Sequence, residues 1–146
     1  MEIERGRAAE NASFSYGEHV IFEDLNFSVS KGELFCLLGP NGCGKTTLLD
    51  SVIGLHRLMS GTIRVMGKEI RDFRPRRLAR LIAYVPQKHE RAFPYTVKEI
   101  VLMGRAAYLN IFESPAREDE VLAEKAIERL GIAHLVRVFF SITLDQ

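Results

Sequence analysis

The N-terminal part of the chain alternates apolar and polar positions with the period of β-strands. Residues 25–29 place Leu, Phe and Val on one side and Asn and Ser on the other, which predicts a strand with one buried face. Residues 30–33 carry turn signals, and residues 61–65 predict a further strand that turns back at residues 67–68. The pattern therefore predicts an antiparallel β-region in this part of the chain.

Two apolar segments lack this alternation. Residues 34–38 (Leu-Phe-Cys-Leu-Leu) are continuously apolar between turn signals, which is typical of a strand covered on both faces in the parallel sheet of an α/β domain. Residues 82–85 predict another short strand, which ends at Pro86. Between the two segments, a glycine-rich loop leads into a helix predicted over residues 45–53 and ended by Gly54.

Helical patterns appear around and after these segments. The spacing of two leucines predicts a helix over residues 75–81, and Thr96 to Glu99 form the capping-box pattern that opens another. Ser114 and Pro115 predict the N-cap and first residue of a third helix, which ends at Gly131. The apolar side of this third helix is predicted to hold Val121, Leu122, Ala126, Ile127 and Leu130.

The composition fits one globular domain and excludes several classes of protein. The chain has 146 residues, of which 47% are hydrophobic, and its net charge of +1 gives no overall field that favours nucleic acid. Arginines surround residues 75–81 without interleaved aromatic residues, which favours a solvated helix face over a nucleic-acid site. No apolar run reaches the ~20 residues of a membrane span, so we expect a cytoplasmic protein. Cys36 and Cys43 have neither metal-ligand nor disulfide spacing and are expected to be reduced.

The glycine-rich loop carries the strongest chemical signal in the sequence. Residues 39–46 read Gly-Pro-Asn-Gly-Cys-Gly-Lys-Thr, which fits the G-x-x-x-x-G-K-[ST] pattern between an apolar segment and a helix. Polyphosphate binding needs many backbone N–H donors and few side chains that block them, and the glycines meet this need. We therefore expect a loop that binds ATP through Gly39, Pro40, Asn41, Gly42, Cys43, Gly44, Lys45, Thr46 and Thr47.

Two side chains of this loop have predicted chemical roles. The Lys45 ammonium is expected to contact the β- and γ-phosphate oxygens, next to the positive end of the following helix. The Thr46 hydroxyl is placed to bind Mg²⁺, a hard ion that takes oxygen ligands. A glycine-rich turn without a ligand is the alternative, and a lysine and a threonine in this register argue against it.

Residues on both sides of the loop resemble one family of P-loop proteins. Residues 14–17 (Phe-Ser-Tyr-Gly), 39–47, 60–63 (Ser-Gly-Thr-Ile) and 84–87 (Tyr-Val-Pro-Gln) form an ordered set that resembles the ATP-binding subunit of ABC transporters. The stretch 96–105, with the helix that follows it, is most similar to importers of iron chelates, haem and cobalamin. The resemblance implies an α/β P-loop NTPase core with an N-terminal antiparallel β-region and the start of a helical subdomain.

The resemblance also implies roles for residues outside the loop. Tyr16 would stack on adenine, a contact that needs only an aromatic face; an ordinary core aromatic is the alternative. Gln87 would contact Mg²⁺ and the attacking water, so the expected catalytic residues are Lys45 and Gln87, and the expected metal-binding residues are Thr46 and Gln87. The implied cofactors are ATP and Mg²⁺. The implied partners are a membrane permease subunit and a second ATP-binding subunit, at the inner face of the cell membrane.

The resemblance runs from Phe14 to Leu135. We expect a P-loop ATP-binding core with its β-region over residues 1–88, a partial helical subdomain over 89–135 and a divergent tail over 136–146. The family's L-S-G-G-Q signature, catalytic glutamate and switch histidine are not found in the sequence. The expectation is thus a C-terminally shortened importer subunit that binds ATP but hydrolyses it poorly alone. A small P-loop phosphotransferase and a non-functional product of a truncated gene remain as alternatives.

Overall fold

The computed structural model describes residues 5–87, 95–110 and 113–138. The chain divides into two compact units, Met1–Leu78 and Ala79–Gln146. This division comes earlier in the chain than the expected boundary between residues 88 and 89. Of the predicted tail, residues 139–146 lie outside the described residues.

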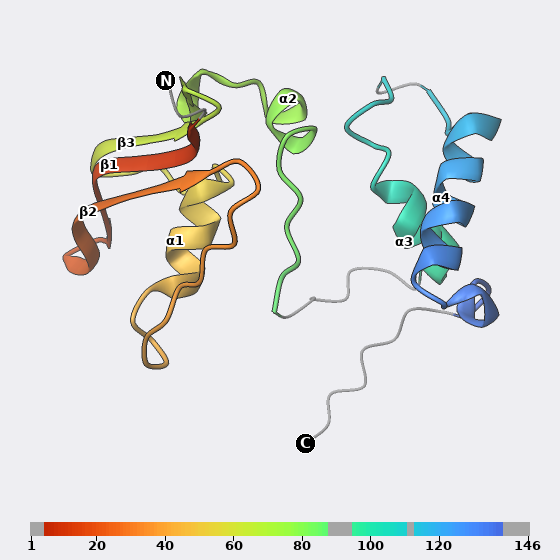
Figure 1. The fold of residues 1–146 in the computed structure, drawn as a ribbon, viewed down its shortest axis with the longest axis horizontal. Helices are drawn as coiled ribbons and strands as arrows, with labels where there is room; N and C mark the ends of the chain where they lie inside the picture. Colours follow the sequence, from red (N-terminus) through yellow and green to blue (C-terminus); the bar gives the residue numbers. More distant parts are fainter. Residues whose placement is uncertain (1–4, 88–94, 111–112, 139–146) are drawn as a thin grey trace. The chain divides into compact units, whose positions relative to one another are not determined.

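The first unit is built on a four-stranded antiparallel sheet (Figure 1). Strands β1 (Arg5–Tyr16) and β2 (His19–Ser30) form a long hairpin. Strands β3 (Ser60–Val65) and β4 (Lys68–Glu69) form a short one, and the strand order is β2-β1-β3-β4. The predicted antiparallel β-region is confirmed, and residues 25, 27 and 29 are more buried than residues 26 and 28, as their alternation predicts.

A single helix closes the core of this unit. Helix α1 (Lys45–Val52) lies along one face of the sheet (Figure 1). Its Leu48 and Val52 side chains form a buried cluster with Ala9 and Ala12 of β1 and Ile63 of β3. The small alanine side chains leave room for the helix, so two strands and the helix share one core. A 3-10 turn, η1 (Ile70–Asp72), and helix α2 (Pro75–Ala79) follow, with Leu78 buried.

The second unit is helical where it is described. It contains α3 (Val97–Met103), α4 (Arg117–Arg129) and the 3-10 turn η2 (Ala133–Leu135). The predicted capping box opens α3, because the Thr96 hydroxyl accepts a hydrogen bond from the Glu99 N–H and the Glu99 carboxylate accepts one from the Thr96 N–H. Two further N–H groups of the first turn of α3 donate to the carbonyls of residues 136 and 138, at 3.3 and 3.1 Å.

Two predicted strands are absent from the described residues. Residues 34–38 and 82–85 belong to no strand, and Leu34 and Leu38 are 96% and 85% exposed. Both predictions are wrong for this structure. A strand forms only where a neighbouring strand completes its hydrogen bonds, and the four-stranded sheet includes neither segment.

Helix α4 also begins and packs differently from the prediction. Its N-cap is Ala116, not Ser114, and the Asp119 carboxylate accepts a hydrogen bond from the Ala116 N–H at 3.0 Å. The side chains that it buries are Asp119, Ala123 and Ile127, whereas three of the residues predicted on its apolar side are exposed: Val121, Leu122 and Leu130. The difference arises because the face of the helix that carries Asp119 packs against α3. There the Arg105 guanidinium binds the Asp119 carboxylate. The predicted end of the helix before Gly131 is confirmed.

Candidate functional site

The glycine-rich loop joins the exposed segment 34–38 to α1. Gly44 is the N-cap of the helix with φ of +89°, a left-handed conformation that favours glycine. It has no side chain to cap the helix, so the N–H groups of the first turn receive no side-chain acceptor from this position. The loop therefore leaves backbone donors at the positive end of α1 open to an external anion.

The side chain of Lys45 folds back over this loop. Its ammonium donates to the carbonyl oxygens of Gly39 and Pro40 at 2.8 and 2.6 Å, and lies 3.6 Å from Cys43 Sγ. These contacts hold a positive charge beside Gly39 and Pro40, the first two residues of the loop. The structure thus brings together four of the predicted loop residues, and the next residue, Thr46, is exposed.

Close packing occurs both within the loop and between the loop and β2. A Cβ atom at Gly39 would lie 2.6 Å from Cys43 Sγ, which is too close for an unmoved side chain. A Cβ atom at Gly44 would lie 2.6 Å from Ile21 Cγ2 in β2. The start of α1 therefore contacts the β1–β2 hairpin a few residues from the hairpin turn. Tyr16, the last residue of β1, precedes the same turn.

Tyr16 lies at the end of β1 with 52% of its surface exposed. It is therefore not an ordinary core aromatic, and its ring offers surface for a contact. Its hydroxyl forms a 3.0 Å hydrogen bond with His56 Nε2, and its ring meets the Phe14 ring edge-on at 4.9 Å between centroids. The adenine-stacking role of Tyr16 stays a prediction.

The sequence analysis assigns no role to His56, yet this residue contacts Tyr16. It follows α1 in the loop before β3, and its Nε2 lies 3.9 Å from Asp50 Oδ2. Tyr16 and His56 are 40 residues apart in sequence, so no sequence motif links them.

Gln87 is exposed and belongs to the second unit. Its predicted contacts with Mg²⁺ and the attacking water therefore stay predictions. The described residues hold no group of three or more His, Cys, Asp or Glu side chains that could bind a metal ion by themselves. Mg²⁺ bound with a nucleotide uses one or two protein oxygens together with phosphate oxygens, and the exposed Thr46 hydroxyl fits that kind of site.

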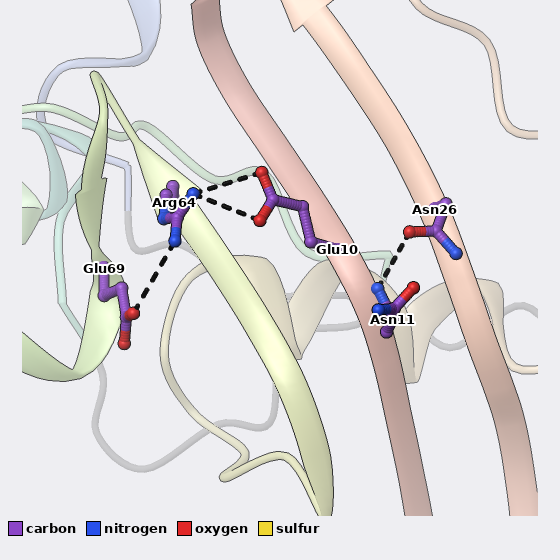
Figure 2. Close-up of polar contacts among 5 residues, drawn as sticks. All are labelled: Glu10, Asn11, Asn26, Arg64 and Glu69. Atoms are coloured by element: carbon purple, nitrogen blue, oxygen red, sulfur yellow. Dashed lines mark hydrogen bonds and ion pairs between the residues drawn. The ribbon is translucent and has the colours of Figure 1, made fainter.

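A separate groove of about 510 Å³ lies over β1, β2 and β3, away from the loop residues. Its polar wall includes Arg64, whose guanidinium pairs with Glu10 at 3.1 Å and with Glu69 at 3.9 Å (Figure 2). On the other side of β1, the Asn11 N–H donates to Asn26 Oδ1 at 2.9 Å. None of the predicted site residues lines this groove, and two of its charged side chains, Glu10 and Arg64, pair with each other.

Comparison with known proteins identifies the family of the chain. A family model described as ABC transporter matches residues 22–142 of the chain. The chain belongs to the ABC transporter family. The match begins after Tyr16, covers the loop and α1, and runs past Leu135, the expected end of the resemblance.

Known members of the ABC transporter family are similar over most of this chain. The molybdate import ATP-binding protein MolC of Haemophilus influenzae is 36% identical over 95% of the chain and 50% of its own length. The probable iron chelatin transport ATP-binding protein of Helicobacter pylori is 40% identical over 86% of the chain and 50% of its own length. A solved structure of a metal-chelate type ABC transporter in an inward-facing conformation is 35% identical, with a TM-score of 0.73, over 92% of this chain and 48% of that one.

The ABC transporter chain spans about half the length of the curated relatives it matches. The likeness to the solved structure confirms the predicted α/β fold of ABC ATPases. Among the residues that the structure describes, no helix has the length and apolar character needed to cross a membrane.

Proposed function

We propose that the chain binds MgATP through residues 39–47, as part of the ATP-binding subunit of an ABC importer. The observation that carries the proposal is the position of the Lys45 ammonium, 2.8 and 2.6 Å from two carbonyls of a glycine loop that leads directly into α1. A phosphate group would replace these carbonyls as the partner of the ammonium. The charge is thus already held where the polyphosphate would bind.

The loop supplies the rest of the anion site from its backbone. Because Gly44 caps α1 without a side chain, the first-turn N–H groups and the positive end of the helix face no competing carboxylate from the cap. The first turn also contains no acidic residue. The lysine ammonium is a compact charge with three donors, and it lacks the rigid planar geometry of an arginine guanidinium. It can therefore contact several oxygens of a triphosphate.

The test is MgATP binding by titration calorimetry for the unmodified chain and for Lys45→Ala. Removing the ammonium from a phosphate site should weaken binding by about tenfold to a hundredfold, because a hydrogen bond to a charged group contributes about 1.5–3 kcal/mol. Lys125→Ala, which removes an exposed lysine from α4, is the matched control and should leave the affinity unchanged. Unchanged affinity in Lys45→Ala would refute the phosphate site.

The activity of the whole protein is a further part of the proposal. By its family, the subunit would hydrolyse ATP with help from Lys45 and Gln87, and Mg²⁺ would be bound through Thr46 and Gln87. Its partners would be a membrane permease and a second ATP-binding subunit, on the cytoplasmic face of the cell membrane. The names of the relatives include molybdate and iron chelatin, so the cargo is proposed only as a metal-containing compound. Co-purification with a permease encoded beside it would support this assignment.

A further inference from the structure

We propose that His56 is a positioning residue that holds the ring of Tyr16 ready for the adenine of ATP. The inference rests on the proposed function, in which Tyr16 stacks on the nucleotide base. It assigns a role to a side chain outside the loop and outside the motifs of the sequence.

Three rings meet where β1 ends. Tyr16 and His56 share the 3.0 Å hydrogen bond between the phenolic oxygen and Nε2, and their rings lie edge-to-face at 5.6 Å and 87°. Phe14 is stacked with the His56 ring at 5.0 Å and 30°, and it meets Tyr16 at 89°. Each ring thus contacts the other two, and the hydroxyl of Tyr16 is the polar link.

His56 has two further neighbours besides Tyr16. Phe14, only 7% exposed, provides a fixed surface for the imidazole ring. Asp50, on α1, places a carboxylate oxygen 3.9 Å from Nε2, and the His56 and Asp50 side chains are 27% and 20% exposed. The imidazole is therefore a firmer anchor than a free surface side chain.

The anchor matters because Tyr16 is exposed at the end of a strand. An exposed aromatic side chain samples several rotamers, and ordering it on binding costs about 0.5–1.5 kcal/mol. A hydrogen bond at the far end of the ring restrains both of its torsions while the exposed ring surface stays open. The backbone of the same hairpin is held at the P-loop through the contact of Ile21 with Gly44.

The experiment compares two ligands, MgATP and Mg-tripolyphosphate, because only the first has an adenine. Binding is measured on the whole chain for Tyr16→Phe, His56→Phe, the double variant and Tyr16→Ala, together with the melting midpoint of each. Phenylalanine keeps an aromatic face at either position and removes the hydrogen bond. His134→Phe, an exposed histidine of η2, is the matched control.

We expect Tyr16→Phe and His56→Phe each to weaken MgATP binding by about twofold to tenfold, the size of one ordered side chain. The double variant should lose no more than either single variant, because both remove the same hydrogen bond. Affinity for Mg-tripolyphosphate should stay unchanged in all of them, and His56→Gln should restore part of the MgATP affinity through its amide.

Other outcomes overturn the proposal in distinguishable ways. Equal losses for both ligands in His56→Phe, or a lower melting midpoint that accounts for the loss, would show a merely structural role. A loss in Tyr16→Ala without one in Tyr16→Phe or His56→Phe would remove His56 and leave the proposed function intact. If the unmodified chain bound neither ligand, the proposed function itself would fail, and the role of His56 with it.

Discussion

The two units of the chain are stabilised in different ways. Among the described residues, the first unit buries a continuous apolar cluster shared by β1, β3 and α1, whereas the second buries only Ala123 and Ile127 as hydrophobic side chains. In their place the second unit uses charged contacts, with Asp119 held by the Arg105 guanidinium at 2.6 Å. The unit with the glycine-rich loop is thus fixed by packing and backbone geometry, and the helical unit by fewer and more polar contacts.

The backbone geometry of the first unit can be tested at a single glycine of β3. Gly61 in β3 has φ of +76°, and a Cβ atom there would lie 2.1 Å from the Asn11 carbonyl oxygen of β1. Gly61→Ala must therefore separate β1 from β3, and we expect a loss of about 3–5 kcal/mol in the free energy of unfolding. Urea unfolding followed by circular dichroism would measure it.

Gly67→Ala is the matched control for this prediction. Gly67 also has a left-handed φ, of +77°, but a Cβ atom there would meet nothing within 4 Å. Only the conformational strain remains, which is about 1–2 kcal/mol. Equal losses in the two variants would show that the close approach of β1 and β3 does not constrain the sheet.

A second test asks how much the small core of the helical unit contributes. Ile127 is 2% exposed, so Ile127→Ala should leave a cavity and lower the free energy of unfolding by about 2–4 kcal/mol. Leu130→Ala, three residues later and 70% exposed, should change it by less than about 0.5 kcal/mol. Hydrogen exchange of the α4 amides would locate the effect. Similar protection in both variants would contradict the burial pattern of this helix.

Features that depend on neighbouring residues could be predicted from the sequence, and features that depend on distant residues could not. The loop at residues 39–46 and the capping box at Thr96 depend on residues only a few positions apart, so their spacing identifies them directly. The strands predicted at 34–38 and 82–85 need neighbours in a sheet, which an apolar run alone does not guarantee. Apolarity identifies a segment that can be buried, and the pairing partner decides whether it becomes a strand.

Contacts between distant residues were the part that the sequence could not reveal. The Tyr16–His56 hydrogen bond joins β1 to the loop after α1, across 40 residues of sequence. The face that α4 buries also depends on a contact between distant residues. The Asp119 carboxylate binds Arg105, which lies 14 residues earlier, and this contact orients the helix. Helical periodicity alone places Asp119 among solvent-exposed positions.

Two carboxylates, Asp119 and Glu99, should make the stability of the helical unit depend weakly on acid. The hydrogen bond from Arg105, followed by that from the Ala116 N–H, lowers the pKa of Asp119 from its ordinary value of 3.8. The hydrogen bond from the Thr96 N–H, followed by that from its hydroxyl, lowers the pKa of Glu99 in the same way. A group whose pKa is lower in the folded state stabilises the fold above its unfolded pKa, and this contribution is lost as the pH falls through the folded value.

Protection of the α3 and α4 amides from hydrogen exchange should therefore fall as the pH is lowered from about 5 toward 3, after correction for intrinsic exchange rates. Asp119→Ala should reduce protection at pH 7 and flatten this acid dependence, because the residue that titrates and its partner contact are both gone. Glu118→Ala removes an exposed carboxylate of the same helical turn. Its pH profile should be the same as that of the unmodified chain. If the two variants gave the same profile, the ion pair of Asp119 with Arg105 would not be what holds α4 in place, and the helical unit would depend on its small apolar core instead.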